Sequence, residues 1–168
     1  MSQMPATPVM PAVPDAPPAP RACLFALAGA RFAVDVRSAR EVVLFDDITA
    51  VPLAPPHLVG VANLRGTVMP IVDARELLGL PESRPGRAVR TLVVRDGVVQ
   101  AALVVDTVLG LEPYEQVVPP DSPTERGPRA LMAGWIQWAG ETLPLLDVPK
   151  ILAALHPSAP TVLQEASA

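Results

Sequence analysis

The fold is decided by the stretch Gly60-Val61-Ala62-Asn63-Leu64-Arg65-Gly66-Thr67-Val68-Met69-Pro70-Ile71-Val72-Asp73. Its apolar pattern predicts two short strands, 61–64 and 68–72, with a tight turn between them. The turn falls at Arg65-Gly66, where glycine supplies the positive φ that a tight hairpin requires. An arginine in such apolar company is costly to bury unless a partner pairs with it. Arg65 is therefore either a member of a structural ion pair or a residue presented to a partner.

A second copy of this stretch lies 74 residues further along the chain (134 minus 60). The shared positions are mainly glycines, a proline, an aspartate and an amide: Gly60 and Gly134, Gly66 and Gly140, Pro70 and Pro144, Asp73 and Asp147, Asn63 and Gln137. The recurring residues are those that a backbone needs for turns and strand ends. Arg65 does not recur, because Ala139 takes its place. The arginine is thus specific to the first copy, although a structural pair peculiar to that half remains open.

The rest of the chain is rich in short apolar runs with the alternation typical of half-buried strands, clearest at Phe32, Val34 and Val36. Further strands are predicted over 24–27, 42–45, 48–53, 91–95, 98–106, 108–112 and 116–119. Residues 38–40 are interpreted as a helical turn, and short helices are predicted after Asp73 and over 148–155. Two halves of about five strands each indicate a mostly β protein built from two small barrels.

Three segments differ in composition. Residues 1–20 carry seven of the 22 prolines, a density that opposes both helix and sheet, and we expect a disordered or polyproline-like tail. A proline-rich docking ligand is the alternative interpretation of this tail. Residues 21–156 form the predicted folded domain, and residues 157–168 are expected to be a flexible C-terminal tail.

Composition limits the possible partners. Half of the residues are apolar but only 4% are aromatic, so the core must be aliphatic. The net charge is −4, Lys150 is the single lysine, and no basic run is present, which argues against a nucleic-acid partner. No apolar stretch approaches the roughly 20 residues of a membrane span, and no secretory signal is recognisable. The single cysteine, Cys23, suits a reducing compartment and is interpreted as a small buried hydrophobe. We expect a cytoplasmic protein without direct membrane insertion.

The search for catalytic chemistry finds no phosphate loop, dinucleotide fingerprint or nucleophile elbow. His57 and His156 lie far apart in sequence without a cluster of metal ligands. Asp73 and Asp147 could form a carboxylate pair, but they are better explained as helix caps. We therefore expect no enzymatic activity, no cofactor and no metal.

Several other residues are interpreted as structural. Asp35 and Asp106 occupy matching strand ends. Met69, Met132 and Trp135 are expected in the core. Trp138 faces the opposite side of its strand from Trp135, so one of the two tryptophans is a candidate contact for a partner.

The sequence from about residue 22 to 155 resembles the CheW family of bacterial chemotaxis coupling proteins. The resemblance rests on the Gly60 to Asp73 stretch with its Asn-Leu-Arg-Gly core, and on three further segments: Ala39-Arg40-Glu41-Val42, Val104-Val105-Asp106 and Leu143-Pro144-Leu145-Leu146-Asp147. It implies two five-stranded SH3-like barrels around a shared apolar core. It also implies a non-enzymatic adaptor that links the cytoplasmic tips of methyl-accepting chemotaxis receptors to the regulatory domain of a CheA-type histidine kinase, in receptor arrays at the inner membrane.

Carried onto this sequence, the resemblance implies that the receptor lies in a groove between the barrels. The matching positions are Ala39, Glu41, Val42, Gly60, Asn63, Leu64, Arg65, Gly66, Val104 and Val105. We expect Glu41 and Arg65 to form an ion pair that holds the hairpin tip in shape, with a purely stabilising pair as the alternative. Ala39 is smaller than the residue usual at its position, so groove contacts are expected to differ.

Other functions remain to be weighed. The output of the system is open, because a CheW-like scaffold can also serve a non-flagellar array such as one controlling type IV pilus motility. A small-barrel nucleic-acid-binding module would need basic grooves and stacking aromatics that this chain lacks. A small hydrolase would need a nucleophile and base pair that the sequence does not offer.

Overall fold

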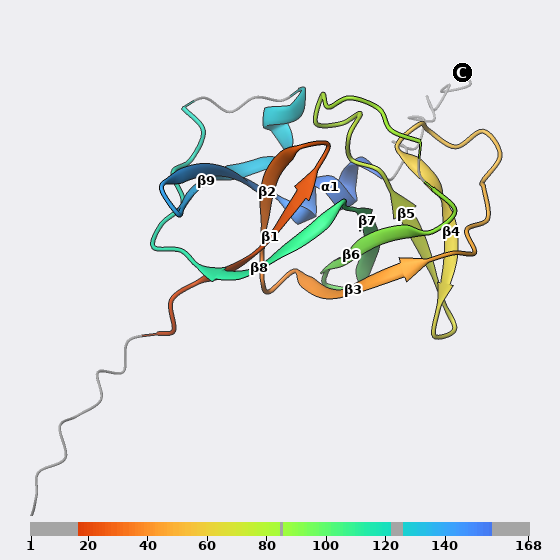
Figure 1. The fold of residues 1–168 in the computed structure, drawn as a ribbon, viewed down its shortest axis with the longest axis horizontal. Coiled ribbons are helices and arrows are strands. Elements are labelled where there is room, and N and C mark those ends of the chain that lie inside the picture. Colours follow the sequence, from red (N-terminus) through yellow and green to blue (C-terminus); the bar gives the residue numbers. More distant parts are fainter. Residues whose placement is uncertain (1–16, 85, 122–125, 156–168) are drawn as a thin grey trace, which may run out of the picture.

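The structure is a computed structural model and describes residues 17–84, 86–121 and 126–155. Ten strands, one 3-10 helix and one α-helix make up these segments (Figure 1). In chain order they are β1 (Arg21–Leu27), β2 (Ala30–Asp35), β3 (Ala39–Phe45), β4 (Leu58–Leu64), β5 (Thr67–Val72), β6 (Val89–Asp96), β7 (Val99–Val104), β8 (Thr107–Pro113), η1 (Pro128–Leu131), β9 (Met132–Trp138), β10 (Glu141–Leu146) and α1 (Val148–Ala154). The prediction of a mostly β chain is confirmed. The expectations for residues 1–16, His156 and 157–168 lie outside the described residues.

The strands form two five-stranded sheets, in the orders β8-β1-β2-β10-β9 and β3-β6-β7-β5-β4. The two orders are equivalent. If five is added to each strand number of the second sheet, with eleven read as β1 and twelve as β2, the order of the first sheet results. Each sheet therefore joins two strands of one sequence half to three of the other. The joining contacts are the antiparallel pairs of β1 with β8 and of β3 with β6, and the parallel contacts of β10 with β2 and of β5 with β7. The expectation that each half of the sequence makes its own barrel is corrected accordingly, because each barrel takes strands from both halves. Each sheet does contain one copy of the repeated strand pair.

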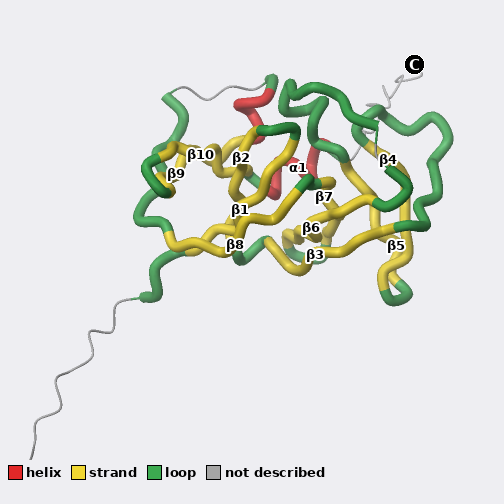
Figure 2. Tube along the Cα trace, in the orientation of Figure 1, coloured by secondary structure: helices red, strands yellow, loops and turns green. Residues whose placement is uncertain are grey.

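Three apolar clusters fill the protein. One lies within each sheet: Phe45, Ala62, Met69, Ile71, Val89, Val93, Ala102 and Val104 in the second sheet, and Ala22, Leu24, Ala33, Tyr114, Ile136, Leu143 and Leu145 in the first. The third cluster is shared between the sheets and includes Phe25, Leu92 and Ile151. Alternation explains this arrangement, because neighbours such as Leu24 and Phe25 point to opposite faces of a strand. Figure 2 shows α1 between the two groups of strands, where it closes the shared cluster.

The recurring glycines have the same task in both copies. A Cβ at Gly60 would lie 2.4 Å from the Thr49 carbonyl oxygen, and a Cβ at Gly134 would lie 2.4 Å from that of Val118. Thr49 bridges to Val61 and Val118 bridges to Trp135, so a connecting segment crosses each strand at its glycine. Glycine is retained at both sites because no side chain fits under the crossing segment.

The two hairpin turns also have one geometry. Arg65 and Gly66 have φ angles of 51° and 86°, and Ala139 and Gly140 have 48° and 80°. Positive φ at both central residues defines the type I′ turn whose twist matches a β-hairpin.

Two predicted strands are wrong. Residues 48–53 contribute only the Thr49 bridge, and residues 116–119 only the Val118 bridge. In the first segment Pro52 has no N–H to donate and Leu53 has a φ of 58°, so a ladder cannot continue. The helical turn predicted at 38–40 is also wrong, because Ala39 and Arg40 already belong to β3 and the turn occupies 36–38.

The predicted caps have different outcomes. Asp147 caps α1, since its Oδ1 accepts a hydrogen bond from the Lys150 N–H at 3.1 Å. Asp73 accepts from the Arg75 N–H at 3.0 Å, but a turn rather than a helix follows it. Gly79 ends that turn with a φ of 65°, and Pro81 follows shortly after. The second copy has Ala153 at the matching position, which lets α1 continue.

Candidate partner-binding site

The predicted ion pair between Glu41 and Arg65 is present. Arg65 Nη1 donates to Glu41 Oε1 at 2.7 Å and Nη2 donates to Oε2 at 2.8 Å, so the contact is bidentate. Glu41 comes from β3, and Arg65 occupies the tip of the β4–β5 hairpin. The pair therefore ties the hairpin tip to the strand at the far edge of the sheet. A bidentate arginine contact fixes the orientation of both side chains.

This pair is displayed at the surface. The Arg65 side chain is 73% exposed and that of Glu41 is 34% exposed. The hydrogen bonds from Arg65, followed by its charge, lower the pKa of Glu41, and the same contacts raise the pKa of Arg65. Both groups are consequently charged at neutral pH. Exposed ion pairs of this kind add little to folding stability, because water screens them.

Beside the pair is a shallow hollow of about 270 Å³ at the open end of the second sheet. Arg40 and Arg95 contribute to its rim, and Leu64, Met69 and Val93 add apolar surface to its lining. Leu64 is partly exposed here, and its contact with a partner stays a prediction. Asn63 supports the tip from within, since its Oδ1 accepts a hydrogen bond from the Gly66 N–H at 2.8 Å.

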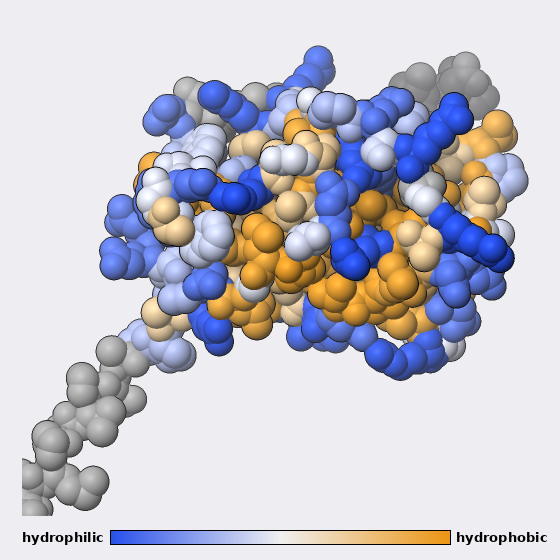
Figure 3. All heavy atoms as spheres, in the orientation of Figure 1, coloured by the Kyte–Doolittle hydropathy of each residue, from blue (hydrophilic) through white to orange (hydrophobic). Residues whose placement is uncertain are grey.

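An apolar surface follows the outer faces of the two edge strands β3 and β8. We call it the edge-strand band, and it consists of Val42 (49% exposed), Leu44 (62%), Leu109 (40%) and Leu111 (46%). Figure 3 shows hydrophobic surface gathered over the part of the molecule where Figure 1 places β8 and β3. The sequence analysis selected only Val42 from this band. The alternation of Val42 with Leu44, and of Leu109 with Leu111, is the signal that could have identified the others.

Three of the remaining predicted positions are buried, and a fourth is partly buried. Val104 belongs to the core of the second sheet and Val105 to the shared core, where both are buried. Gly60 lies under the crossing segment at Thr49, and Ala39 is partly buried against the shared core. Contact between these positions and a partner stays a prediction, which would require the buried ones to become accessible. Gly66 stays exposed in the turn.

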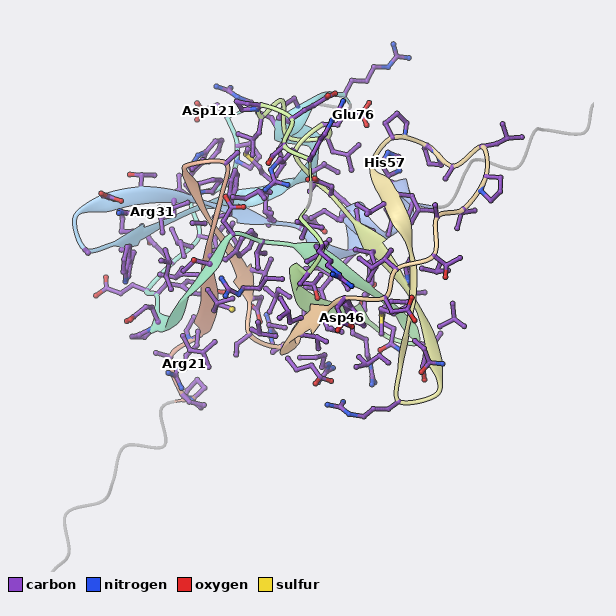
Figure 4. The ribbon with its side chains drawn as sticks, turned by 45° about the vertical axis from the view of Figure 1, so that its right-hand side comes forward. Arg21, Arg31, Asp46, His57, Glu76 and Asp121 are labelled. Atoms are coloured by element: carbon purple, nitrogen blue, oxygen red, sulfur yellow. The ribbon has the colours of Figure 1, made fainter. Side chains whose placement is uncertain are left out.

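The second hairpin tip presents different chemistry at the matching place. Arg31 of β2 donates from Nη1 to Glu141 Oε2 at 2.6 Å, and its guanidinium carbon lies 5.8 Å from the centroid of the Trp138 ring. Gln137 donates to the Thr142 hydroxyl at 2.8 Å, whereas Asn63 in the first copy bonds to the turn itself. Figure 4 places Arg31 beside the blue β9–β10 ribbon. Trp135 and Trp138 are both partly exposed, so the core prediction for Trp135 is only partly met.

A buried arginine closes the junction between the sheets. Arg75 is 5% exposed and donates from Nη1 to Asp73 at 2.7 Å and from Nη2 to Asp106 at 2.7 Å. Asp106 also accepts from the Ala28 N–H at 2.7 Å, which links the β1–β2 turn to the same cluster. The sequence analysis did not single out Arg75. Its position two residues after a turn aspartate was the available signal.

Cys23, predicted to be a small buried hydrophobe, and His57, considered above as a metal ligand, are placed as follows. Cys23 is buried, and burial raises the pKa of its thiol. His57 Nδ1 lies 3.9 Å from Glu76 Oε2, and Figure 4 shows the two residues on neighbouring segments. Within the described segments, no group of three or more His, Cys, Asp or Glu residues is arranged to hold a metal ion. None of the helices in those segments has the length and apolarity to cross a membrane.

Comparisons with known proteins agree with this architecture. Residues 21–156 match the family described as "CheW: CheW-like domain". The chain is 32% identical over 132 residues to "Protein FrzA" of Myxococcus xanthus, covering 76% of this chain and 82% of that protein. It is 30% identical over 83 residues to "Chemotaxis protein CheW" of Bacillus subtilis, covering 49% of this chain and 53% of the relative. The crystal structure of scaffolding protein TtCheW from Thermoanaerobacter tengcongensis superimposes with a TM-score of 0.69 at 24% identity, over 77% of this chain and 89% of that chain. The two-barrel, SH3-like fold implied by the sequence is thereby confirmed.

Proposed function

The chain belongs to the CheW-like domain family, and from this premise we propose that it is a non-enzymatic adaptor in a bacterial chemosensory array. It couples the cytoplasmic tip of a methyl-accepting receptor to the regulatory domain of a CheA-type histidine kinase. Its place is the cytoplasmic side of the inner membrane, where it is held by those partners. The observation that carries the proposal is the exposed, bidentate Glu41–Arg65 pair, whose Glu41 lies on the same strand that presents the exposed apolar residues Val42 and Leu44 on its other face.

The apolar surface suits a helical partner. The receptor tip is expected to be a helical hairpin, whose apolar stripe can be covered by residues such as Val42 and Leu44. Burial of apolar area provides the main free energy in helix-in-groove recognition. A surface of this kind on a folded domain is typical of an interaction site.

The ion pair has a separate part in this proposal. Arg65 is held in one orientation at the hairpin tip by two hydrogen bonds, so its free donors and the hairpin edge are presented to the partner in a fixed geometry. Charged groups at the rim of an interface govern orientation and association rate more than affinity. Removal of the pair should therefore disturb docking without disturbing the fold.

The test compares Arg65→Ala with wild type in a pull-down against a receptor cytoplasmic fragment and, separately, the kinase regulatory domain. We expect receptor capture to fall at least about tenfold while Tm changes by less than about 3 °C, because an exposed pair contributes little to stability. Arg31→Ala is the matched control, since it removes an equally short exposed pair from the other barrel. Equal losses in both variants, or a large fall in Tm for Arg65→Ala, would assign the pair to stability instead.

A second candidate concerns the output of the array. FrzA covers more of this chain than the Bacillus relative does, and its name does not describe it as a chemotaxis protein. This observation favours a CheW-like scaffold for a non-flagellar system, such as control of type IV pilus motility. Deletion of the gene separates the two: loss of directed swimming supports a flagellar output, and loss of surface twitching with normal swimming supports the pilus output.

A further inference from the structure

Prolines recur in the N-terminal segment with a fixed spacing. Every third residue from position 5 to position 20 is a proline: Pro5, Pro8, Pro11, Pro14, Pro17 and Pro20. The polyproline II helix has about three residues per turn, so this spacing would align all six rings on one face. The positions between them are mostly alanine, valine and methionine, with Asp15 as the single charge. The segment therefore has the pattern of a polyproline ligand with a continuous proline stripe.

A hollow of about 870 Å³ lies at the outer end of the first barrel. Its lining comes from the segment that follows β8 and from the tip of the β9–β10 hairpin, and includes Pro113, Tyr114, Gln116, Val118 and Trp138. Aromatic and proline side chains with a few polar neighbours form the type of groove that binds polyproline II peptides.

Both aromatic side chains of the hollow are held in place. The Tyr114 hydroxyl donates to Asp35 Oδ2 at 3.1 Å, which fixes the ring from the interior side. The Trp138 ring is covered on one side by Arg31, which is itself paired with Glu141. A groove whose walls are already ordered loses little conformational entropy when a ligand binds.

The proline-rich segment is attached at this hollow. Ala19 and Pro20 belong to its lining, and the Tyr114 N–H donates to the Pro20 carbonyl oxygen at 2.9 Å. Residues 1–16 are outside the described part of the chain, and the described part begins at Pro17, three residues from this hydrogen bond. A ligand tethered this closely has an effective concentration of about millimolar or more, so even weak docking is populated.

We propose that residues 8–16 occupy this hollow in the polyproline II conformation, with Pro8, Pro11 and Pro14 directed toward Trp138. Nine residues at about 3.1 Å each extend about 28 Å, enough to cross the hairpin tip from the attachment at Pro20. The tail is then an internal ligand of the first barrel, and the hollow is a site for proline-rich peptides. This inference does not depend on the adaptor function.

The experiment uses the full chain, with a nitroxide attached at Ala6→Cys and the indole N–H signals recorded by ¹⁵N NMR. Cys23 is buried with a raised thiol pKa, so it reacts slowly and labelling can be directed to position 6. The matched control carries the same label with Pro8, Pro11 and Pro14 replaced by serine, which keeps the tail length and leaves the barrels unchanged. Trp135 serves as an internal reference, because it faces the other side of β9 from Trp138.

We expect the nitroxide to increase the relaxation rate of the Trp138 indole at least twofold more in the proline tail than in the serine tail, with a smaller change at Trp135. Equal rates in the two tails would show a merely tethered chain and would overturn the proposal. Mixing ¹⁵N-labelled chains without nitroxide and unlabelled chains carrying it tests the other occupant. Broadening of Trp138 only in that mixture would assign the hollow to the tail of a second copy and would equally overturn docking within one chain.

Discussion

The β4–β5 and β9–β10 hairpins share one backbone geometry but present different side chains at their tips. Both cross a neighbouring segment at a glycine and turn with nearly identical positive φ angles at the tip. The first tip carries Arg65, paired with Glu41, where the second carries Ala139. The comparison teaches that the repeated residues encode geometry, whereas the residues that differ between the copies encode what each barrel presents to other molecules.

The strongest test of the shared geometry is Gly60→Ala against Gly134→Ala. Each added Cβ would meet a carbonyl oxygen at 2.4 Å, so the crossing segment must shift in either variant. We expect each substitution to lower the free energy of unfolding by about 3 kcal/mol or more, through overpacking and backbone strain. Urea unfolding measures both. A difference of more than about 1 kcal/mol between the two variants would show that the copies are not equivalent.

Arg75 provides the next test, because its counterpart 74 residues on is Pro149, so the second copy has no arginine at the matching position. Arg75→Ala leaves Asp73 and Asp106 without their cation. We expect a loss of about 2–4 kcal/mol in the free energy of unfolding, less than for a fully buried pair because Asp106 is partly exposed. Arg31→Ala, which breaks an exposed pair, should cost less than about 1 kcal/mol. Similar losses of unfolding free energy in Arg75→Ala and Arg31→Ala would contradict the distinction between a buried cluster and an exposed pair.

The sequence predicts the repeated strand pairs well because glycine, proline and aspartate act locally. Gly66 and Gly140 specify turns, and Asp147 specifies a helix start, through contacts within a few residues. Val42 was predicted as a partner contact from the family resemblance and not from alternation, because it belongs to a continuous apolar run. The Glu41–Arg65 pair was predicted from the family resemblance and not from periodicity.

Other features depend on contacts between distant segments, and periodicity cannot show these. The exchange of strands between the sequence halves follows from parallel contacts such as Ile71 with Ala102, 31 residues apart (102 minus 71). Val104 and Val105 were assigned as contacts through the family resemblance, yet both faces of this segment are covered, one by its own barrel and one by the shared core. The pairing of Arg75 with Asp106 likewise requires the assembled sheets.

Asp35 and Asp106 provide the comparison with the smallest expected effect on stability. They occupy matching strand ends but have different partners. Asp106 accepts from Arg75 and the Ala28 N–H, whereas Asp35 accepts from Arg37 and the Tyr114 hydroxyl. The hydrogen bond from the Arg37 side chain, with smaller contributions from its backbone N–H and from Tyr114, lowers the pKa of Asp35. A lowered pKa in the folded state means that the carboxylate stabilises the fold above the unfolded value of about 3.9, and that this contribution is lost as pH falls through the folded value.

Asp35→Asn should therefore lower the free energy of unfolding by about 1 kcal/mol at pH 7, a figure reduced for the exposure of Arg37. The difference from wild type should shrink as the pH falls from the unfolded value of about 3.9 through the lower folded value, because below both values the two chains are uncharged at this position. Tyr114→Phe is expected to change stability at the alkaline end of the pH range instead. Burial, followed by the charge of Asp35, raises the pKa of Tyr114, so its contribution is complete below the unfolded value of about 10 and is lost as pH rises further. Urea titrations from pH 2.5 to 11 should show Asp35→Asn flattening mainly the acid limb of the stability curve and Tyr114→Phe mainly the alkaline limb. An unchanged acid limb in Asp35→Asn would mean that the strand end is held by its backbone contacts and not by the carboxylate.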